Sequence, residues 1–126
     1  MVLTSTPGAA RLEPLLHGRP GKYVLPIGSE ERALDFAHGF RILRQKFEVE
    51  RMLIVGGAEV ATALLEARLV DEIFLTQSAR LLGGAERKTI FEGNGFTPEG
   101  APTARLMTAK IGVRDEQTLF LRYRLT

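Results

Sequence analysis

The sequence of 126 residues contains no cysteine. The chain therefore has no disulfide framework, no thiol nucleophile and no thiolate ligands for a metal. No apolar run approaches the length that spans a membrane, and the amino terminus lacks the basic-then-apolar pattern of a secretory signal. These absences make a cytoplasmic protein the expectation.

A marked excess of one charge sign is also missing. The formal net charge is +2, and the charged residues, 25% of the chain, are interspersed rather than grouped. Proteins that bind nucleic acid or anionic membranes concentrate basic charge, so we expect neither partner. The hydrophobic fraction is 44%, which is ordinary for a globular protein. A chain of this length can bury a real core, and we expect a single domain over residues 1–126.

The most regular pattern runs from Arg51 to Thr76. Four successive apolar residues, Met52–Val55, predict a strand buried on both faces. Gly56-Gly57 interrupts the pattern, and helical spacing begins at Ala58. Apolar residues on one face of this predicted helix are Val60, Ala61, Leu64 and Leu65. A second buried strand, Ile73–Thr76, follows the stop signal Asp71-Glu72. The stretch thus predicts a parallel strand–glycine turn–helix–strand crossover.

The glycine pair has two interpretations. Residues without side chains at the end of a buried strand let a ligand approach the backbone closely. The following helix directs free amides and its positive dipole end at the same place, which favours a phosphate. Such pairs also occur as tight turns without a ligand. The glycines alone leave both interpretations open.

Shorter elements precede this stretch. Met1–Thr6 predicts a strand, Ala9–Leu16 a short helix, and Lys22–Ile27 a second strand near a sheet edge, because Pro26 cannot donate to a ladder. A longer helix is predicted to begin at a Ser29 cap. Its inward face has apolar residues at helical spacing: Ala33, Phe36, Ala37, Phe40, Leu43 and Phe47.

The carboxyl-terminal part predicts an antiparallel hairpin. Residues 107–113 and 119–125 alternate with period two, and Arg114–Gln117 lies between them. Met107 is predicted to share a face with Ala109, Ile111 and Val113. Arg122 and Arg124 alternate on one strand face, and Phe120 lies two residues before Arg122, which makes this face a candidate interface. Residues 87–102 are rich in glycine and proline and predict an irregular excursion over the surface.

Ile54–Val60 and Leu64–Thr76 together resemble the dihydrofolate-reductase-like fold. They are most similar to the reductase domain of the bacterial bifunctional riboflavin-biosynthesis deaminase–reductase. Leu81–Gly84 and Leu3–Gly8 resemble further segments of that domain. The resemblance implies an α/β three-layer sandwich with a mostly parallel sheet and a carboxyl-terminal antiparallel hairpin.

The same resemblance implies NADPH as cofactor. It places the backbone amides of Gly56, Gly57, Ala58 and Glu59 against the pyrophosphate. It places the hydroxyls of Thr4, Ser5 and Thr6 near the adenosine 2′-phosphate, where neutral donors suit an anion. Alternatively, Thr4–Thr6 only cap the next helix.

This sequence also departs from the family pattern. It lacks the amino-terminal part of the domain, which carries the first strand and much of the substrate site, so the expected domain is amino-terminally truncated. Val55 stands where the riboflavin reductases commonly have a glutamate. No general acid can be named, and His17 and His38 have no carboxylate at ligand spacing, so we expect no metal site.

The sequence thus predicts an NADPH-dependent reductase of riboflavin-biosynthesis type. The expected reaction is hydride transfer to the ribosyl carbonyl of a phosphoribosylamino-pyrimidine; the expected partner is a small pyrimidine or pterin-like substrate. The alternative is a non-catalytic NADPH-binding or dimerisation module without the substrate half. Open sheet edges predict a homodimer in either case.

Overall fold

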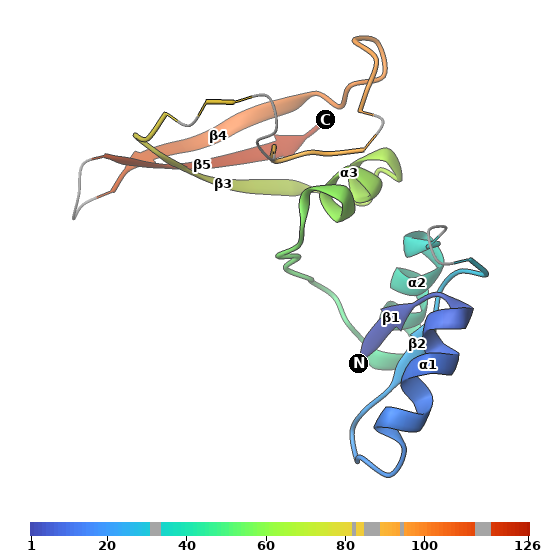
Figure 1. Cartoon of the computed structure of the whole chain (residues 1–126). Helices are drawn as coiled ribbons and strands as arrows, with labels where there is room; N and C mark the ends of the chain where they lie inside the picture. Colours follow the sequence, from blue (N-terminus) through green and yellow to red (C-terminus); the bar gives the residue numbers. More distant parts are fainter. Residues whose placement is uncertain (31–33, 82, 85–88, 94, 113–116) are drawn as a thin grey trace. The chain divides into compact units, whose positions relative to one another are not determined.

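The chain divides into two compact units, Met1–Ile54 and Val55–Thr126. The computed structural model describes residues 1–30, 34–81, 83–84, 89–93, 95–112 and 117–126 (Figure 1). Each unit is described by itself below. The expectation of one domain over residues 1–126 stays a prediction.

The first unit alternates strands and helices. Its elements are β1 (Val2–Thr4), α1 (Thr6–Leu16), β2 (Val24–Pro26) and α2 (Phe36–Phe47). β1 and β2 pair in parallel, with Val2 opposite Val24 and Thr4 opposite Pro26. A parallel pair requires a crossover connection, and α1 provides it. The predicted strands and short helix of this region are confirmed, and β2 has β1 as its one described neighbour.

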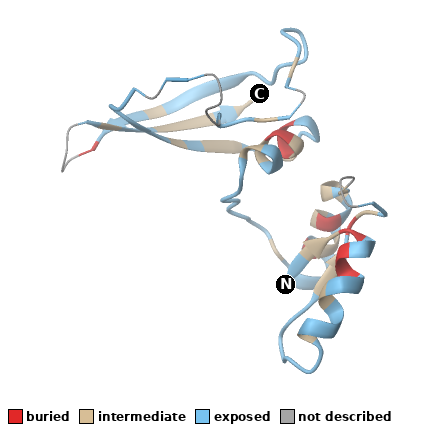
Figure 2. Cartoon of the chain, viewed as in Figure 1, coloured by how far each residue is buried: buried red, intermediate tan, exposed pale blue. Residues whose placement is uncertain are grey.

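Two glycines reveal the layers of this unit. A Cβ atom on Gly39 of α2 would lie 3.1 Å from Cδ2 of Leu3 and 2.9 Å from Cγ2 of Ile27. A Cβ atom on Gly8 of α1 would collide with Oγ1 of Thr4. Successive side chains of a strand point to opposite faces, so Leu3 and Thr4 place α2 and α1 on opposite faces of the sheet. The unit is an α/β/α sandwich, with Ala9, Ile27 and Leu43 in its core (Figure 2).

The second unit joins a helix to an antiparallel sheet. Its elements are α3 (Ala58–Glu66), β3 (Glu72–Ser78), β4 (Ala104–Ile111) and β5 (Thr118–Leu125), and the strand order is β3–β5–β4. The predicted hairpin is confirmed as the β4–β5 pair. Leu64 and Leu65 of α3 are buried, as predicted from helical spacing, whereas Val60 is exposed and Thr62 is buried instead. The hydroxyl of Thr62 donates to the carbonyl of Ala58, so this polar group has a hydrogen-bond partner although Thr62 is buried.

The predicted buried strand Met52–Val55 is wrong. These residues belong to no strand, and Val55 is 90% exposed. A strand persists only where a neighbouring strand accepts and donates its backbone hydrogen bonds. The described strands pair without this segment, and β3 pairs with β5 in antiparallel orientation. The predicted parallel crossover through Gly56-Gly57 is therefore absent from the structure.

Two local predictions also need correction. The long helix begins at Phe36 rather than after Ser29, because Oδ1 of Asp35 accepts from the amide of His38 at 2.8 Å and caps it. Ala33 lies outside the described residues. On β4, a register shift between Leu106 and Thr108 leaves Met107 without a partner on β5 and interrupts the predicted alternation with Ala109 and Ile111. Val113 lies outside the described residues.

Candidate functional site

Thr4, Ser5 and Thr6 connect the end of β1 to the start of α1. Ser5 is the N-cap of the helix, and its Oγ accepts from the amide of Gly8 at 3.2 Å. Only 4% of Ser5 is exposed. Thr6 is exposed, and both its amide and its Oγ1 donate to the carbonyl oxygen of Gly28, at 2.7 and 3.1 Å. The alternative that this segment caps the helix is confirmed for Ser5.

The first amides of α1 are consequently in use. The amide of Thr6 donates to Gly28, Pro7 has no amide hydrogen, and Gly8 and Ala9 both donate to Ser5. A phosphate at this terminus would find no free backbone donor. Of the three predicted residues here, Thr6 alone is exposed, and the single hydrogen of its hydroxyl is donated to Gly28.

At the start of α3, in contrast, the first backbone amides are left without acceptors. Gly57 is its N-cap and provides no side-chain hydrogen bond. The first intrahelical bond runs from the amide of Ala61 to the carbonyl of Gly57, at 3.1 Å. Within the described part of the chain, the amides of Ala58, Glu59 and Val60 have no acceptor. Three free donors at the positive end of a helix dipole form an arrangement that suits a phosphate.

Nothing inside the unit requires glycine at position 57. Its φ of −71° and ψ of 167° are accessible to any residue. A Cβ atom at this position would meet no heavy atom within 4 Å. The space in front of the three amides is therefore open, as a bound diphosphate requires. The carboxylate of Glu59 would repel such a ligand, so Glu59 fits the site through its amide and not its side chain.

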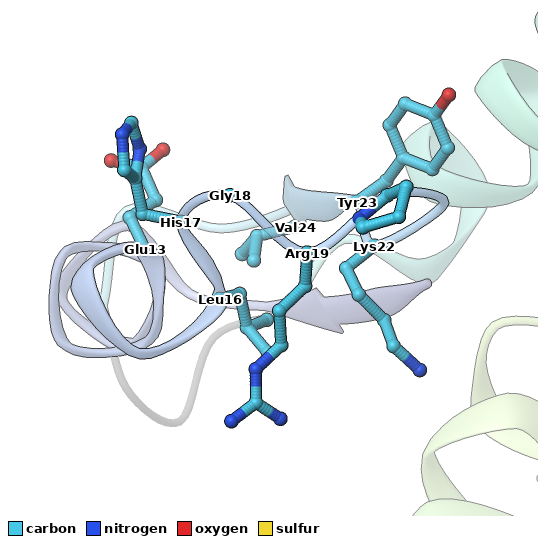
Figure 3. Close-up of a pocket in the computed structure, with 9 residues that line it drawn as sticks. Glu13, Leu16, His17, Gly18, Arg19, Lys22, Tyr23 and Val24 are labelled. Atoms are coloured by element: carbon cyan, nitrogen blue, oxygen red, sulfur yellow. The ribbon is translucent and has the colours of Figure 1, made fainter.

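The described cavity lies elsewhere. It is an open depression of about 620 Å³ in the first unit, formed by the end of α1, the following turn and the start of β2. His17 lies beside Glu13, whereas Arg19 and Lys22 extend toward the other side (Figure 3). None of the predicted cofactor residues lines it.

Charged side chains on the sheet were not predicted to interact. Glu72 of β3 accepts from Arg122 of β5 through two bonds, at 2.6 and 2.9 Å, and from Nη2 of Arg124 at 3.0 Å. The hydrogen bonds from Arg122, followed by those from Arg124, lower the pKa of the Glu72 carboxyl. The hydrogen bonds to Glu72, followed by its negative charge, raise the pKa of Arg122. Along the sequence, Asp71-Glu72 indicates a stop signal and not an ion pair. The sequence did contain one signal for this cluster: Arg122 and Arg124 are two residues apart, which places both side chains on one face of the strand.

Other chemistry has little support from the geometry. The described residues contain no group of three metal-ligating side chains, and none of their helices is long and apolar enough to cross a membrane. His38 lies in the first turn of α2, where its amide bonds to Asp35, and His17 ends α1. Among the residues that the structure describes, no general acid can be named.

Comparison with models of protein families shows to which family the chain belongs. The model of the RibD C-terminal domain matches residues 1–120. The chain belongs to this family. The family's dihydrofolate-reductase-like fold agrees with the α/β sandwich and the antiparallel sheet described above. Comparison with proteins of curated function gives no match.

Solved structures show the same fold. RibD from Acinetobacter baumannii, form 2, is 21% identical with a TM-score of 0.66, and the match covers 84% of this chain and 27% of that one. A pyrimidine reductase-like protein from Corynebacterium diphtheriae is 19% identical with a TM-score of 0.69, over 93% of this chain and 44% of that one. The chain thus spans less than half the length of these structures.

Proposed function

We propose that this chain binds NADPH and acts in a riboflavin-type reduction of a phosphoribosylamino-pyrimidine. The observation that carries the proposal is the start of α3, where three amides lack acceptors and the space at Gly57 is open. Membership of the RibD C-terminal domain family adds the reaction type. The bound nicotinamide would supply a hydride to the ribosyl carbonyl.

The residues of this chain would hold the cofactor rather than react with it. The amides of Ala58, Glu59 and Val60 would donate to the diphosphate, and Gly56 and Gly57 would let it approach. The hydroxyl of Thr6 would exchange its bond to the Gly28 carbonyl for one to the adenosine 2′-phosphate. Ser5 would act indirectly, because its side chain caps α1. Thr4, which pairs with Pro26, would orient the segment.

A fluorescence titration of the purified protein with NADPH and, separately, with NADH tests the proposal. Saturable binding that favours NADPH is the expected result. A second assay follows NADPH oxidation with the pyrimidine substrate. Binding without turnover would make the chain a non-catalytic cofactor-binding module, and absence of binding to either nucleotide would contradict the proposal.

We also propose that the chain forms a homodimer. In the described part of the sheets, β3 and β4 are edge strands of seven and eight residues, and β1 and β2 each have one neighbour. An open edge presents unpaired amides and carbonyls to a second copy. Sedimentation equilibrium should give twice the monomer mass, and a monomer at micromolar concentration would contradict this expectation.

A further inference from the structure

One face of the β3–β5–β4 sheet combines exposed aromatic and basic side chains. Residues opposite one another in an antiparallel pair share a face, and so do alternate residues along a strand. The register therefore places the following charged and aromatic side chains on this face, which we name the basic sheet face: Glu72, Phe74, Arg105, Lys110, Phe120, Arg122 and Arg124. Four hydroxyl side chains, Thr76, Ser78, Thr108 and Thr118, lie on the same face. The opposite face carries half-buried apolar residues, including Ile73, Leu75 and Leu121.

The two phenylalanines form one patch. Phe74 lies opposite Arg122, and Phe120 is two residues before Arg122 on the same strand, so the two rings occupy diagonal positions on neighbouring strands. Phe74 is 66% exposed and Phe120 is 49% exposed. Aromatic residues and arginine are enriched at the centres of protein interfaces, and this patch contains both.

Positive charge is concentrated around this patch. Four basic side chains and one carboxylate give the face an excess of three positive charges, which is larger than the formal +2 of the whole chain. Glu72 is already bonded to Arg122 and Arg124. Arg105 and Lys110 of β4 are exposed and have no ion-pair partner in the part of the chain that the structure describes. Two cations therefore remain available on this face: Lys110 lies opposite Phe120, and Arg105 lies opposite Arg124.

We propose that the basic sheet face docks an acidic polypeptide segment that carries apolar side chains. The apolar groups would cover Phe120 and the part of Phe74 that Arg122 leaves exposed, and the carboxylates would pair with Arg105 and Lys110. Charge complementarity of this kind directs encounter and selects partners. The inference concerns a surface separate from the cofactor residues and does not depend on the proposed reductase activity.

The geometry disfavours two other occupants. Face-to-face contact with a second copy would oppose two surfaces that each carry three excess positive charges. Single-stranded nucleic acid binds sheets by stacking bases on exposed ring faces. The guanidinium of Arg122 lies 5.7 Å from the centroid of the Phe74 ring, so it occupies the position that a base would need.

Fluorescence anisotropy with defined peptides tests the proposal on the full chain. The probe is a labelled glutamate-rich peptide with two phenylalanines. Matched peptides replace either every glutamate by glutamine or both phenylalanines by alanine. Saturable binding of the acidic, phenylalanine-containing probe is expected, with both matched peptides at least about tenfold weaker.

Paired charge reversals locate the surface. The double variant Arg105→Glu with Lys110→Glu should lower the affinity for the probe peptide by about tenfold or more, because two attractive charges become repulsive. Arg19→Glu with Lys22→Glu changes the net charge equally on exposed residues of the first unit, and should alter affinity by less than about twofold. Circular dichroism verifies that both variants stay folded. Phe74→Thr, which preserves strand propensity, should also lower the affinity for the probe peptide.

Several results would overturn the proposal. Equal weakening by the two double variants would mean that net charge and not this face binds the probe. Equal binding of the glutamine peptide would remove the role of the carboxylates. Preference for an oligothymidine would assign the face to nucleic acid, and loss of self-association on Phe74→Thr in sedimentation equilibrium would assign it to a second copy.

Discussion

The amino termini of α1 and α3 lie at the two segments that the sequence associates with a cofactor, and they differ in how their amides are satisfied. α1 begins with a buried serine whose Oγ accepts from Gly8, and a carbonyl of the neighbouring loop accepts from Thr6. α3 begins with a glycine that offers no side chain, and its first three amides lack acceptors. A helix must satisfy these donors by capping, by water or by a ligand.

This difference separates a terminus that its own cap closes from one whose amides are left open. At α1 the protein has used its own oxygen atoms, so no backbone amide of this terminus is left for a phosphate. At α3 the omission of a cap costs helix stability, because glycine at the N-cap is less favourable than serine. We interpret this cost as the consequence of leaving the amides to the diphosphate.

The largest expected effect comes from Gly57→Val. Its backbone angles suit valine, and a Cβ atom would meet no neighbour, so the fold should persist. The branched side chain would occupy the space in front of the α3 amides and should weaken NADPH binding by more than about tenfold in a fluorescence titration. Gly57→Ser should make α3 resemble α1, with weaker binding but a more stable helix. Unchanged affinity in both variants would make the glycine pair a structural turn.

A smaller effect is expected at Thr6, the exposed hydroxyl of the α1 terminus. Thr6→Glu should repel the 2′-phosphate and weaken NADPH by roughly fivefold, equivalent to about 1 kcal/mol, with little change for NADH. Thr6 is a better probe than Ser5, because a glutamate at buried position 5 would disrupt the fold. Gln45→Glu, an exposed position of α2, is the control of equal charge. Equal loss for both nucleotides would contradict a contact with the 2′-phosphate.

Ser5→Ala should reveal the structural role of the α1 terminus. The substitution removes the cap and leaves the Gly8 amide buried without its acceptor. The free energy of unfolding should fall by about 1–2 kcal/mol in urea denaturation. Ser78→Ala, at the exposed end of β3, should change it by less than about 0.5 kcal/mol. A Ser5 variant as stable as this control would remove the distinction between the two termini.

In the second unit, ion pairs from Glu72 to Arg122 and Arg124 join β3 to β5. The substitution Glu72→Gln tests how much these ion pairs stabilise the sheet. Bonds from Arg122 and Arg124 hold the pKa of Glu72 below its ordinary value of 4.5, so its charge stabilises the fold above pH 4.5. This contribution is lost as pH falls through the lowered pKa of the folded state. The variant should therefore be less stable than the parent at pH 7, and the difference in melting temperature should shrink below pH 4.5. Glu99→Gln, at an exposed residue, is the control; a difference independent of pH would exclude the charge as its cause.

Patterns along the chain predicted most elements correctly. β1, β2, β3 and the β4–β5 hairpin follow from short apolar or alternating runs. The same rule failed at Met52–Val55, where four apolar residues are exposed and unpaired. Whether an apolar run becomes a strand depends on an edge elsewhere in the chain that can pair with it, and local pattern carries no information about that edge.

The candidate site divides in the same way. The sequence predicted that hydroxyls at 4–6 and glycines at 56–57 meet a cofactor, but a hydroxyl before a helix suits both a cap and a phosphate contact. Ser5 became the cap because α1 begins at Thr6, which turns its Oγ toward Gly8. The bonding of Glu72 could not be predicted either, because Arg122 and Arg124 lie 50 and 52 residues further along the chain.

By itself, the sequence determined the membership of the RibD C-terminal domain family, most of the order of helices and strands, and the absence of thiol chemistry, because each follows from residue type and local spacing. Only the tertiary structure decided which helix terminus is closed and which is open, and which side chains share the basic sheet face. These properties depend on hydrogen bonds and strand register between distant segments. Such contacts exist only after the chain has folded.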